Sequence, residues 1–281
     1  MGSDIRIGFS MHPRWAGAEG LDAFIAPLRR SGLSSLEFEL DDQQENWIDF
    51  VPLMEAAFQM GLGLSFHAPY RPPHHLAGFA RQERSRIQDD YRPALAIAET
   101  WALKSPQCRT VVIHAAVARE PAVRKDLIED TLAFLAWVLD EFPELQIALE
   151  NNHPARPGEV KIGVEPEDVL SMLAVLDTPR LGACWDLGHD YLRQKGTVPT
   201  QAWLSRVVHV HVHDVDENGE DHFPLIFGRV PYEPWLRAWK AVTRGGGVVL
   251  ELKGKHLQNW SQSQIADALE TSIASLNEVL S

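Results

Sequence analysis

The strongest constraint on the fold is a recurring pattern in which a short apolar run ends in a side chain that can bind a metal ion or carry a proton. Such runs end at His67, His114, Glu150, Asp186, the alternating His209, His211 and His213, and Glu251. Near-continuous Val, Ile and Leu runs are typical of parallel strands that are buried on both faces. In parallel α/β sheets the functional residues gather at the carboxyl ends of the strands, so the pattern predicts one shared site.

Two further strands are expected near residues 5–10 and 35–40, which gives eight strands with helices between them. A doubly wound open sheet would also place ligands at strand ends. However, neighbouring strands lie ~4.8 Å apart, so an open sheet spreads those ends along a line. Side chains from so many strands converge only if the sheet closes. We therefore expect a (β/α)8 TIM barrel that forms a single domain over residues 1–281, a length close to the roughly 250 residues typical of this fold.

Helical periodicity and turn residues place the remaining elements. Helices are expected at about 21–30, 47–60, 83–102, 122–141, 166–176, 199–205, 231–243 and 261–279, and loops at 11–14, 68–75, 151–163 and 214–229. The last helix carries Ile265, Leu269, Ile273 and Leu276 on one stripe, as expected for a helix packed outside a barrel. Gly245-Gly246-Gly247 is expected to form a turn before the eighth strand.

The composition limits the classes of partner. A formal net charge of -13 and the lack of a basic run make nucleic acid an unfavourable partner and favour a small polyhydroxylated molecule. No apolar run approaches the ~20 residues that span a bilayer, so we expect a cytoplasmic protein with no membrane association. The two cysteines, Cys108 and Cys184, are expected to be small core residues. Nothing in the sequence excludes a homo-oligomer.

The segment Asp186-Leu187-Gly188-His189 places a carboxylate and an imidazole on either side of a glycine turn. This arrangement suits a metal site on a loop. The alternative is that Asp186 caps the following helix and His189 is an ordinary loop histidine.

Four residues from strands five to eight would surround the mouth of a closed barrel: Glu150, Asp186, His211 and Glu251. Three carboxylates and an imidazole suit one divalent ion such as Mn²⁺, Mg²⁺, Co²⁺ or Zn²⁺. Without a metal, we expect the carboxylates to repel one another and to raise one another's pKa values.

Four more histidines, His67, His114, His189 and His222, are each compatible with a hydrogen-bonded core or loop position. Together they predict either ligands for a second and third ion or, with Tyr70, contacts to the oxygens of a polar substrate. Of the alternating histidines we favour His211 as the ligand, with His209 deeper in the core and His213 turned toward loop structure. Glu37 and Glu39 share one face of the second strand and are expected to be solvated or paired with other side chains; the alternative is that either points into the barrel interior near its top.

The motifs resemble, in order and spacing, the xylose isomerase-like barrel superfamily, and the resemblance covers nearly the whole chain. They are Phe66-His67-Ala68-Pro69-Tyr70, Val112-Ile113-His114-Ala115, Leu149-Glu150-Asn151-Asn152, Asp186-Leu187-Gly188-His189, His211-Val212-His213-Asp214, His222-Phe223-Pro224-Leu225 and Leu250-Glu251. The superfamily contains sugar isomerases and epimerases as well as the endonuclease IV group of abasic-site nucleases.

The resemblance implies different sites in the two branches. In the sugar branch Glu150, Asp186, His211 and Glu251 would bind one metal, the two glutamates would pass a proton between substrate carbons, and His189 would contact substrate oxygens. In the nuclease branch these residues would bind three zinc ions together with His67, His114, His189 and His222.

The chain departs from both branches. Glu220 stands where the nuclease has an aspartate two residues before the histidine matched by His222, and Arg71 follows Tyr70 where the nuclease has an apolar wedge. The ketose epimerases carry an arginine in the loop after strand seven, but residues 214–221 contain none.

The favoured hypothesis is a metal-dependent isomerase or epimerase of a sugar-like hydroxycarbonyl compound, which needs one to three ions. In this hypothesis the metal bridges two substrate oxygens and stabilises an enediolate, while Glu150 and Glu251 act as acid and base. The alternatives are a zinc phosphodiesterase or abasic-site nuclease, and a barrel that binds metal and ligand without turnover.

Overall fold

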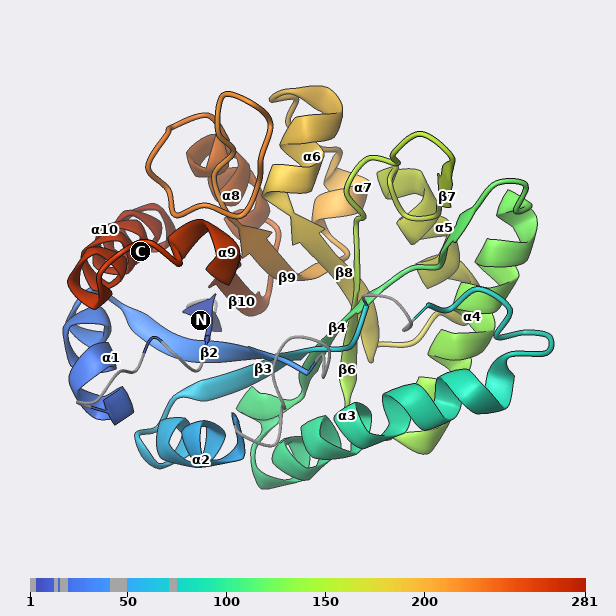
Figure 1. The fold of residues 1–281 in the computed structure, drawn as a ribbon, viewed down its shortest axis with the longest axis horizontal. Helices are drawn as coiled ribbons and strands as arrows, with labels where there is room; N and C mark the ends of the chain where they lie inside the picture. The colour runs from blue at the N-terminus through green and yellow to red at the C-terminus, as the bar shows by residue number, and fades with distance from the viewer. Residues whose placement is uncertain (1–3, 13–14, 16–19, 41–49, 71–74) are drawn as a thin grey trace.

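Eight parallel strands close into a barrel in the computed structural model, which describes residues 4–12, 15, 20–40, 50–70 and 75–281 (Figure 1). The strands are β1 (Asp4–Ser10), β2 (Leu33–Glu39), β3 (Gly63–His67), β4 (Thr110–His114), β6 (Gln146–Glu150), β8 (Leu181–Asp186), β9 (Val207–Val212) and β10 (Gly245–Leu250). Their order around the barrel is β1-β10-β9-β8-β6-β4-β3-β2, and β1 pairs with both β2 and β10 to close the ring. The predicted (β/α)8 fold is confirmed.

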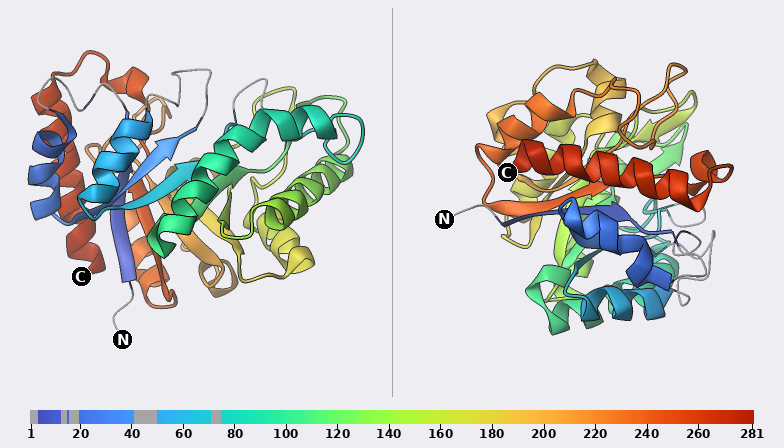
Figure 2. Two further views of the ribbon diagram at one scale, coloured as in Figure 1. Left: turned by 90° about the horizontal axis from the view of Figure 1, so that it is seen from below. Right: turned by 90° about the vertical axis from the view of Figure 1, so that its left-hand side faces the viewer.

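Helices surround the barrel, as two further views show (Figure 2). They are α1 (Gly20–Arg30), α2 (Val51–Gln59), α3 (Arg84–Lys104), α4 (Arg124–Glu141), α5 (Pro166–Leu176), α6 (Leu187–Gln194), α7 (Gln201–Leu204), α8 (Tyr232–Lys240), α9 (Gly254–Leu257) and α10 (Gln262–Leu280), with a 3-10 turn at Pro106–Cys108. The predicted stripe of α10 is buried. A capping box of Ser261 and Gln264 starts this helix.

The triple glycine does not form the expected turn, because it is the first half of β10. A Cβ on Gly246 would lie 2.4 Å from the carbonyl oxygen of Val208, and one on Gly247 would lie 2.6 Å from the His209 ring. The glycines therefore allow β9 and its histidine to approach β10 closely.

The long loop after β6 contains a strand that the sequence did not predict. β7 (Glu159–Lys161) pairs antiparallel with β5 (Val117–Arg119) from the loop after β4. This two-stranded sheet fixes the backbone at one side of the barrel mouth. Parts of the predicted loops at 11–14 and 68–75 and of the predicted helix at 47–60 lie outside the described residues.

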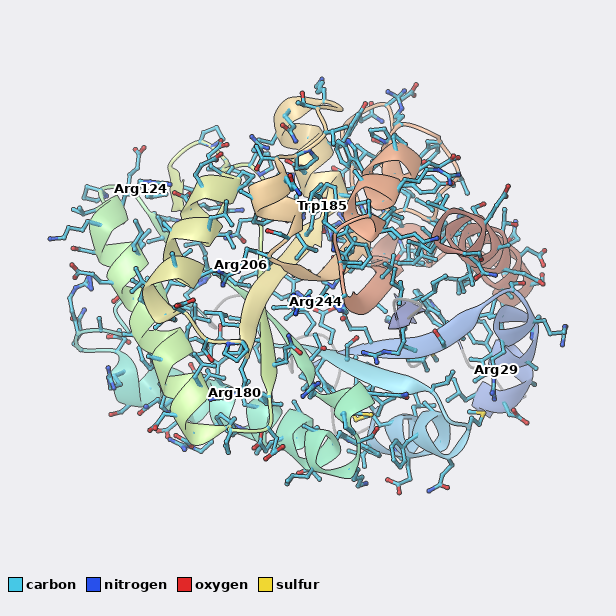
Figure 3. The ribbon with its side chains drawn as sticks, turned by 180° about the vertical axis from the view of Figure 1, so that it is seen from behind. Arg29, Arg124, Arg180, Trp185, Arg206 and Arg244 are labelled. Atoms are coloured by element: carbon cyan, nitrogen blue, oxygen red, sulfur yellow. The ribbon has the colours of Figure 1, made fainter. Side chains whose placement is uncertain are left out.

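The amino ends of the later barrel strands are preceded by arginines. Arg180, Arg206 and Arg244 stand directly before β8, β9 and β10 and lie on the face seen from behind (Figure 3). Arg180 donates through Nη1 to the carbonyl oxygen of Phe142 at 3.1 Å, which ties the end of α4 to the start of β8. A structural contact of this kind suits the face of a TIM barrel opposite the site, whose residues serve stability.

Both cysteines are free and buried, as expected. Within the described part of the chain, no helix has the length and apolar character needed to cross a bilayer.

Candidate metal centre

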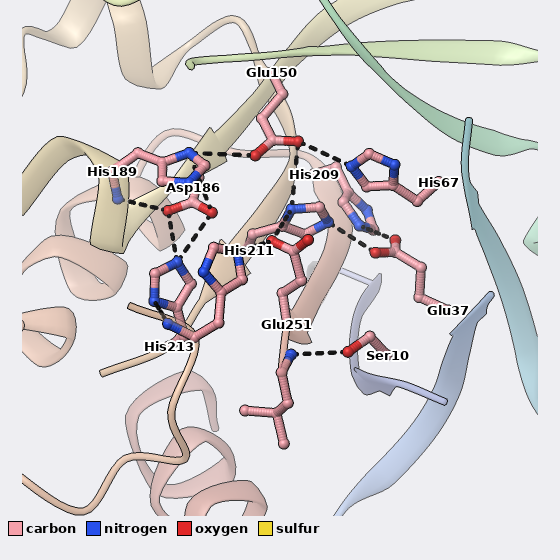
Figure 4. A network of polar contacts seen from close by, with 12 residues as sticks. Ser10, Glu37, His67, Glu150, Asp186, His189, His209, His211, His213 and Glu251 are labelled. Carbon is pink, nitrogen blue, oxygen red and sulfur yellow. Dashed lines mark hydrogen bonds and ion pairs between the residues drawn. The ribbon is translucent and has the colours of Figure 1, made fainter. Parts of the chain in front are cut away.

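The barrel brings together the four residues that the sequence predicts as the main metal ligands. Glu150 ends β6, Asp186 ends β8, His211 lies in β9 and Glu251 follows β10. One donor atom from each lies within 4.8 Å of the others (Figure 4). Glu150, Asp186 and His211 are fully buried, whereas the side chain of Glu251 is 14% exposed. The four strand ends thus form a site with one accessible side.

The ring of His211 lies between carboxylates. Its Nδ1 is 3.1 Å from Oε2 of Glu251 and 3.6 Å from Oε2 of Glu150, while its Nε2 is 2.8 Å from Oε1 of Glu37. Among the described residues, Nδ1 of His211, Oε1 of Glu150 and Oε2 of Glu251 have no hydrogen-bond partner of good geometry. Buried polar atoms without hydrogen bonds are costly. A cation coordinated by these atoms would remove that cost, so the donor set fits a divalent metal ion.

Asp186 caps the following helix and also lies in the group of possible metal ligands, so the structure does not separate the two alternatives. It is the N-cap of α6, since its Oδ1 accepts the N–H of His189 at 2.7 Å. Its own N–H donates to Oδ1 of Asn151 at 2.7 Å. The backbone contacts hold the carboxylate rigidly beside Glu150, so capping and metal binding are compatible here.

His213 contacts the loop through Nδ1, as expected, but its Nε2 faces the cluster, which the sequence did not predict. Its Nε2 lies 3.0 Å from Oδ1 of Asp186, and its Nδ1 accepts the N–H of His222 at 2.9 Å. A Cβ on Gly188 would lie 1.9 Å from Cε1 of His213, so the glycine makes room for the ring. The acceptor role of Nδ1 implies that Nε2 carries the proton donated to Asp186.

His67 and His114 converge on Glu150 from β3 and β4. Their Nε2 atoms lie 3.3 Å and 3.1 Å from Oε2 of Glu150 and 3.2 Å from each other. Nδ1 of His67 donates to the carbonyl oxygen of Ala68, and Nδ1 of His114 donates to Oδ1 of Asn152, both at 2.8 Å. Because each Nδ1 carries a hydrogen, each Nε2 can offer a lone pair to a cation. This is a second group that could hold a metal ion.

A third group contains Asp186, His189, His213 and His222. His189 donates through Nδ1 to the carbonyl oxygen of Asn151 at 3.0 Å, which leaves Nε2 as an acceptor. Nε2 of His222 lies 3.2 Å from Oε2 of Glu251, so this imidazole connects the third group to the first.

Asp221 is a buried member of this region that the sequence analysis missed. Its Oδ1 lies 2.9 Å from Nδ1 of His222 and 2.7 Å from Nζ of Lys253. Glu220, the residue at the position of the nuclease aspartate, is exposed and instead lies 3.4 Å from Lys255. Asp221 directly precedes His222 in the acidic loop, and this position in the sequence could have indicated that it belongs to the site.

Aromatic and acidic residues from the earlier strands complete the site. The ring of Tyr70 stacks on His114 at 4.7 Å and lies 4.9 Å from His67. Glu37 is buried and paired with His211 and His209, in agreement with the expectation of a paired carboxylate, and His209 lies at the deeper end of this contact. Glu39 is partly buried. Arg71 lies outside the described residues.

The pKa values of the three carboxylates are lowered overall rather than raised, although Glu150 does raise the pKa of Asp186 as expected. Burial raises the pKa of Glu150 and Glu251, but neighbouring histidines lower both values well below the usual range, and the pKa of Asp186 is also lowered. Histidine rings next to the carboxylates explain the lowered pKa values. His211 contacts both Glu150 and Glu251, and His189 contacts both Glu150 and Asp186. Burial lowers the pKa of His67, yet Glu150 raises it to about 9. The site is therefore rich in carboxylates and in protons that a metal ion could replace.

A cavity of about 980 Å³ opens above these residues. Tyr70, His114, Glu150, His189, His222 and Glu251 contribute to its wall. The cavity gives a small molecule access to Glu150 and Glu251 while Asp186 and His211 lie beneath them.

Known families and solved structures include barrels of the same architecture. The family described as xylose isomerase-like TIM barrel matches residues 16–279. Comparison with curated proteins gives no match. Among solved structures, a D-tagatose 3-epimerase-like protein superposes with a TM-score of 0.66 at 18% identity, covering 99% of this chain and 100% of that one.

Two other solved structures are similar over nearly their whole length. A D-allulose 3-epimerase from Methylomonas sp., in complex with D-allulose, has a TM-score of 0.66 at 14% identity and covers 98% of this chain and 97% of that one. A 3-keto-D-glucoside 4-epimerase from E. coli has a TM-score of 0.63 at 15% identity and covers 98% of this chain and 100% of that one. At these identities the similarity shows the shared barrel fold.

Proposed function

Since the chain belongs to the xylose isomerase-like TIM barrel family, we propose that it is a divalent-metal-dependent isomerase or epimerase of a sugar or sugar-like hydroxycarbonyl compound. The observation that carries the proposal is the set of Glu150, Asp186, His211 and Glu251, whose donor atoms converge at the base of a large cavity. The named structural relatives, which are epimerases acting on ketoses and a ketoglucoside, support this substrate class.

Glu150, Asp186, His211 and Glu251 would hold the ion. A bound divalent ion would supply Lewis-acid polarisation of substrate oxygens. Glu150 and Glu251 would carry the proton that leaves one carbon and arrives at another, because both carboxylates border the cavity and neither forms a salt bridge with a lysine or arginine among the described residues.

The neighbouring residues would bind and orient the substrate. Burial lowers the pKa of His189 to about 4, so this imidazole is neutral near pH 7 and can contact substrate hydroxyls through Nε2. Tyr70 and His114 form a stacked aromatic wall over the cavity, and sugar rings commonly pack on such a surface. His67 and His222 bring further imidazole nitrogens to Glu150 and Glu251.

A zinc phosphodiesterase of the abasic-site nuclease type is the second candidate. It is favoured by the two additional groups of possible ligands, one at His67, His114 and Glu150 and one at Asp186, His189, His213 and His222. It is disfavoured by the net charge of -13. A barrel that binds metal and ligand without turnover is the third candidate.

The experiment that tests the proposal is a metal count per chain combined with an activity screen. Elemental analysis of protein loaded with Mn²⁺, Co²⁺ or Zn²⁺ would give the number of ions per chain. The loaded protein would then be assayed with ketoses and with a phosphodiester. Ketose conversion by protein with bound metal supports the proposal. Phosphodiester hydrolysis with two or three ions and no ketose conversion would replace it with the second candidate.

A further inference from the structure

The carboxylate of Asp221 binds two side chains closely in the wall of the cavity. Its Oδ1 lies 2.9 Å from Nδ1 of His222 and 2.7 Å from Nζ of Lys253, and the side chain is only 10% exposed. Nε2 of His153 and Nε2 of His189 lie 3.7 Å and 4.0 Å from Oδ2, which is beyond the length of a hydrogen bond. The short contacts of Asp221 are therefore those to His222 and Lys253.

The backbone of His222 is held in an unusual conformation. Its φ is 65°, in the left-handed region that residues other than glycine seldom adopt. Its N–H donates to Nδ1 of His213 at 2.9 Å, and its carbonyl oxygen accepts the N–H of Lys253 at 3.2 Å. Such conformations persist only where surrounding contacts fix them, and they gather at functional sites. The main chain of His222 is thus fixed on both sides of its ring.

Lys253 connects this histidine to the metal centre. It follows Glu251 by two residues, its main chain binds the carbonyl oxygen of His222, and its ammonium group binds Asp221. The loop after β9 is therefore tied to the segment after β10 next to the point where Nε2 of His222 lies 3.2 Å from Oε2 of Glu251.

The contact with Asp221 decides which nitrogen of His222 can meet a cation. Nδ1 donates its proton to the carboxylate, so Nε2 is the nitrogen that can offer a lone pair beside Glu251. A carboxylate behind a ligand histidine fixes the tautomer and the orientation of the ring and raises its basicity.

We propose that Asp221 is a positioning residue of the metal centre, which acts with Lys253 to hold Nε2 of His222 toward the ion at Glu251. This inference rests on the proposed function, because it concerns the metal centre assigned there. It extends that centre to a carboxylate that coordinates nothing itself and acts through the imidazole.

The test observes the ring of His222 directly. Protein with ¹⁵N-labelled histidine is studied by NMR in the metal-free and the Zn²⁺-loaded form, and the signals of His222 are identified by their loss in His222→Gln. The variants are Asp221→Ala, Asp221→Asn, whose amide oxygen can still accept the proton, and Glu217→Ala, a matched control that removes an exposed carboxylate from the same loop. Zn²⁺ affinity is measured for each by competition with a chromophoric chelator.

Wild-type protein is expected to show a proton on Nδ1 of His222 that exchanges slowly with water in both forms. Asp221→Ala should lose this slow exchange and bind Zn²⁺ about tenfold to a hundredfold more weakly. Asp221→Asn should keep the proton and lose less affinity, because only the charge is removed, and Glu217→Ala should match the wild type.

A slowly exchanging Nδ1 proton that persists in Asp221→Ala, or wild-type Zn²⁺ affinity in that variant, would overturn the proposal. If Asp221→Ala does not fold, Asp221→Asn decides, and wild-type affinity there would overturn it. Both expected effects in a protein that converts no sugar would count against the proposed function and leave the positioning role of Asp221 in place.

Discussion

Oε1 of Glu37 lies 2.8 Å from Nε2 of His211, on the side of the ring opposite Glu251. Oε2 of the same carboxylate lies 2.9 Å from Nε2 of His209 and accepts a hydrogen bond from Ser65 at 2.8 Å. Burial raises the pKa of Glu37, but His211 and His209 together lower it far below its usual range. An ionised carboxylate behind a ligand histidine orients the ring and raises its basicity. Glu37 is therefore expected to position His211 for the metal.

Glu37→Gln should weaken metal binding by about tenfold to a hundredfold while the barrel remains folded. The amide keeps the volume but no longer offers a charged acceptor to His211. The measurement is metal affinity by competition with a chromophoric chelator, with circular dichroism to confirm folding. Glu55→Gln on α2, whose side chain is 53% exposed, is the matched control. If Glu37→Gln binds metal as tightly as the wild type, Glu37 does not position His211 for the metal.

Replacing the additional histidines separates a site with one ion from a site with several. If only Glu150, Asp186, His211 and Glu251 hold metal, then His67→Ala, His114→Ala and His222→Ala should keep the metal and change substrate binding. If these histidines are ligands, each change should remove metal, because loss of one imidazole severely weakens a site with three or four ligands. We expect at least partial loss, since the lone pairs of His67 and His114 face Glu150 only 3.2 Å apart. Elemental analysis decides, and full metal content in all three variants would contradict this expectation.

Metal-free protein should lose stability as the pH rises from about 6.5 to about 9. Burial lowers the pKa of His222 and of His67, but contacts with Glu251 and with Glu150 raise each value to about 9. A histidine with a raised pKa contributes stability that is fully present below its unfolded pKa of about 6.5 and is lost as the pH passes the folded value. The check is the unfolding temperature of chelator-treated protein from pH 6 to pH 9.5. His222→Ala and His67→Ala should each flatten the decline, and an unchanged profile in both would refute the assignment.

Duplex DNA should bind weakly, and what binding exists should fall steeply with salt. The net charge of -13 opposes association with phosphates, although metal ions could reverse the field locally. The measurement is fluorescence anisotropy with a labelled duplex, intact or carrying an abasic site, at two salt concentrations. Tight binding selective for the abasic site at physiological salt, with incision abolished by a chelator, would favour the nuclease instead.

The sequence predicted the strands and the convergence of their ends because each strand is an apolar run followed by a polar residue. It could not predict β5 and β7, which are short, half-buried and, within the described part of the chain, paired as a separate two-stranded sheet. Gly245-Gly246-Gly247 predicts a turn because glycine usually marks one. Its strand conformation depends on the close approach of Val208 and His209, which only the folded barrel shows.

Within the site, the direction of each ring depends on contacts between distant segments. His213 points to Asp186 because the backbone of His222 donates to its other nitrogen, and Gly188 leaves space for it. The lowered pKa values of Glu150 and Glu251 likewise depend on imidazoles from other strands and from the loop that contains His222. Strand position therefore predicts which residues meet, but not how their rings are oriented or charged.

The most direct test of the proposed function is transfer of solvent deuterium to a substrate carbon. Metal-loaded protein would be incubated in D₂O with a panel of ketoses, ketose phosphates and sugar acids, and each sample would be followed by NMR. We predict that at least one compound gains deuterium at the carbon next to its carbonyl and is converted to an epimer or isomer. Glu251→Gln, folded but with weakened metal binding, should abolish the exchange because a proton carrier and ligand is lost. Normal exchange by Glu251→Gln, or no exchange in any compound by fully loaded wild-type protein that hydrolyses a phosphodiester, would contradict the account.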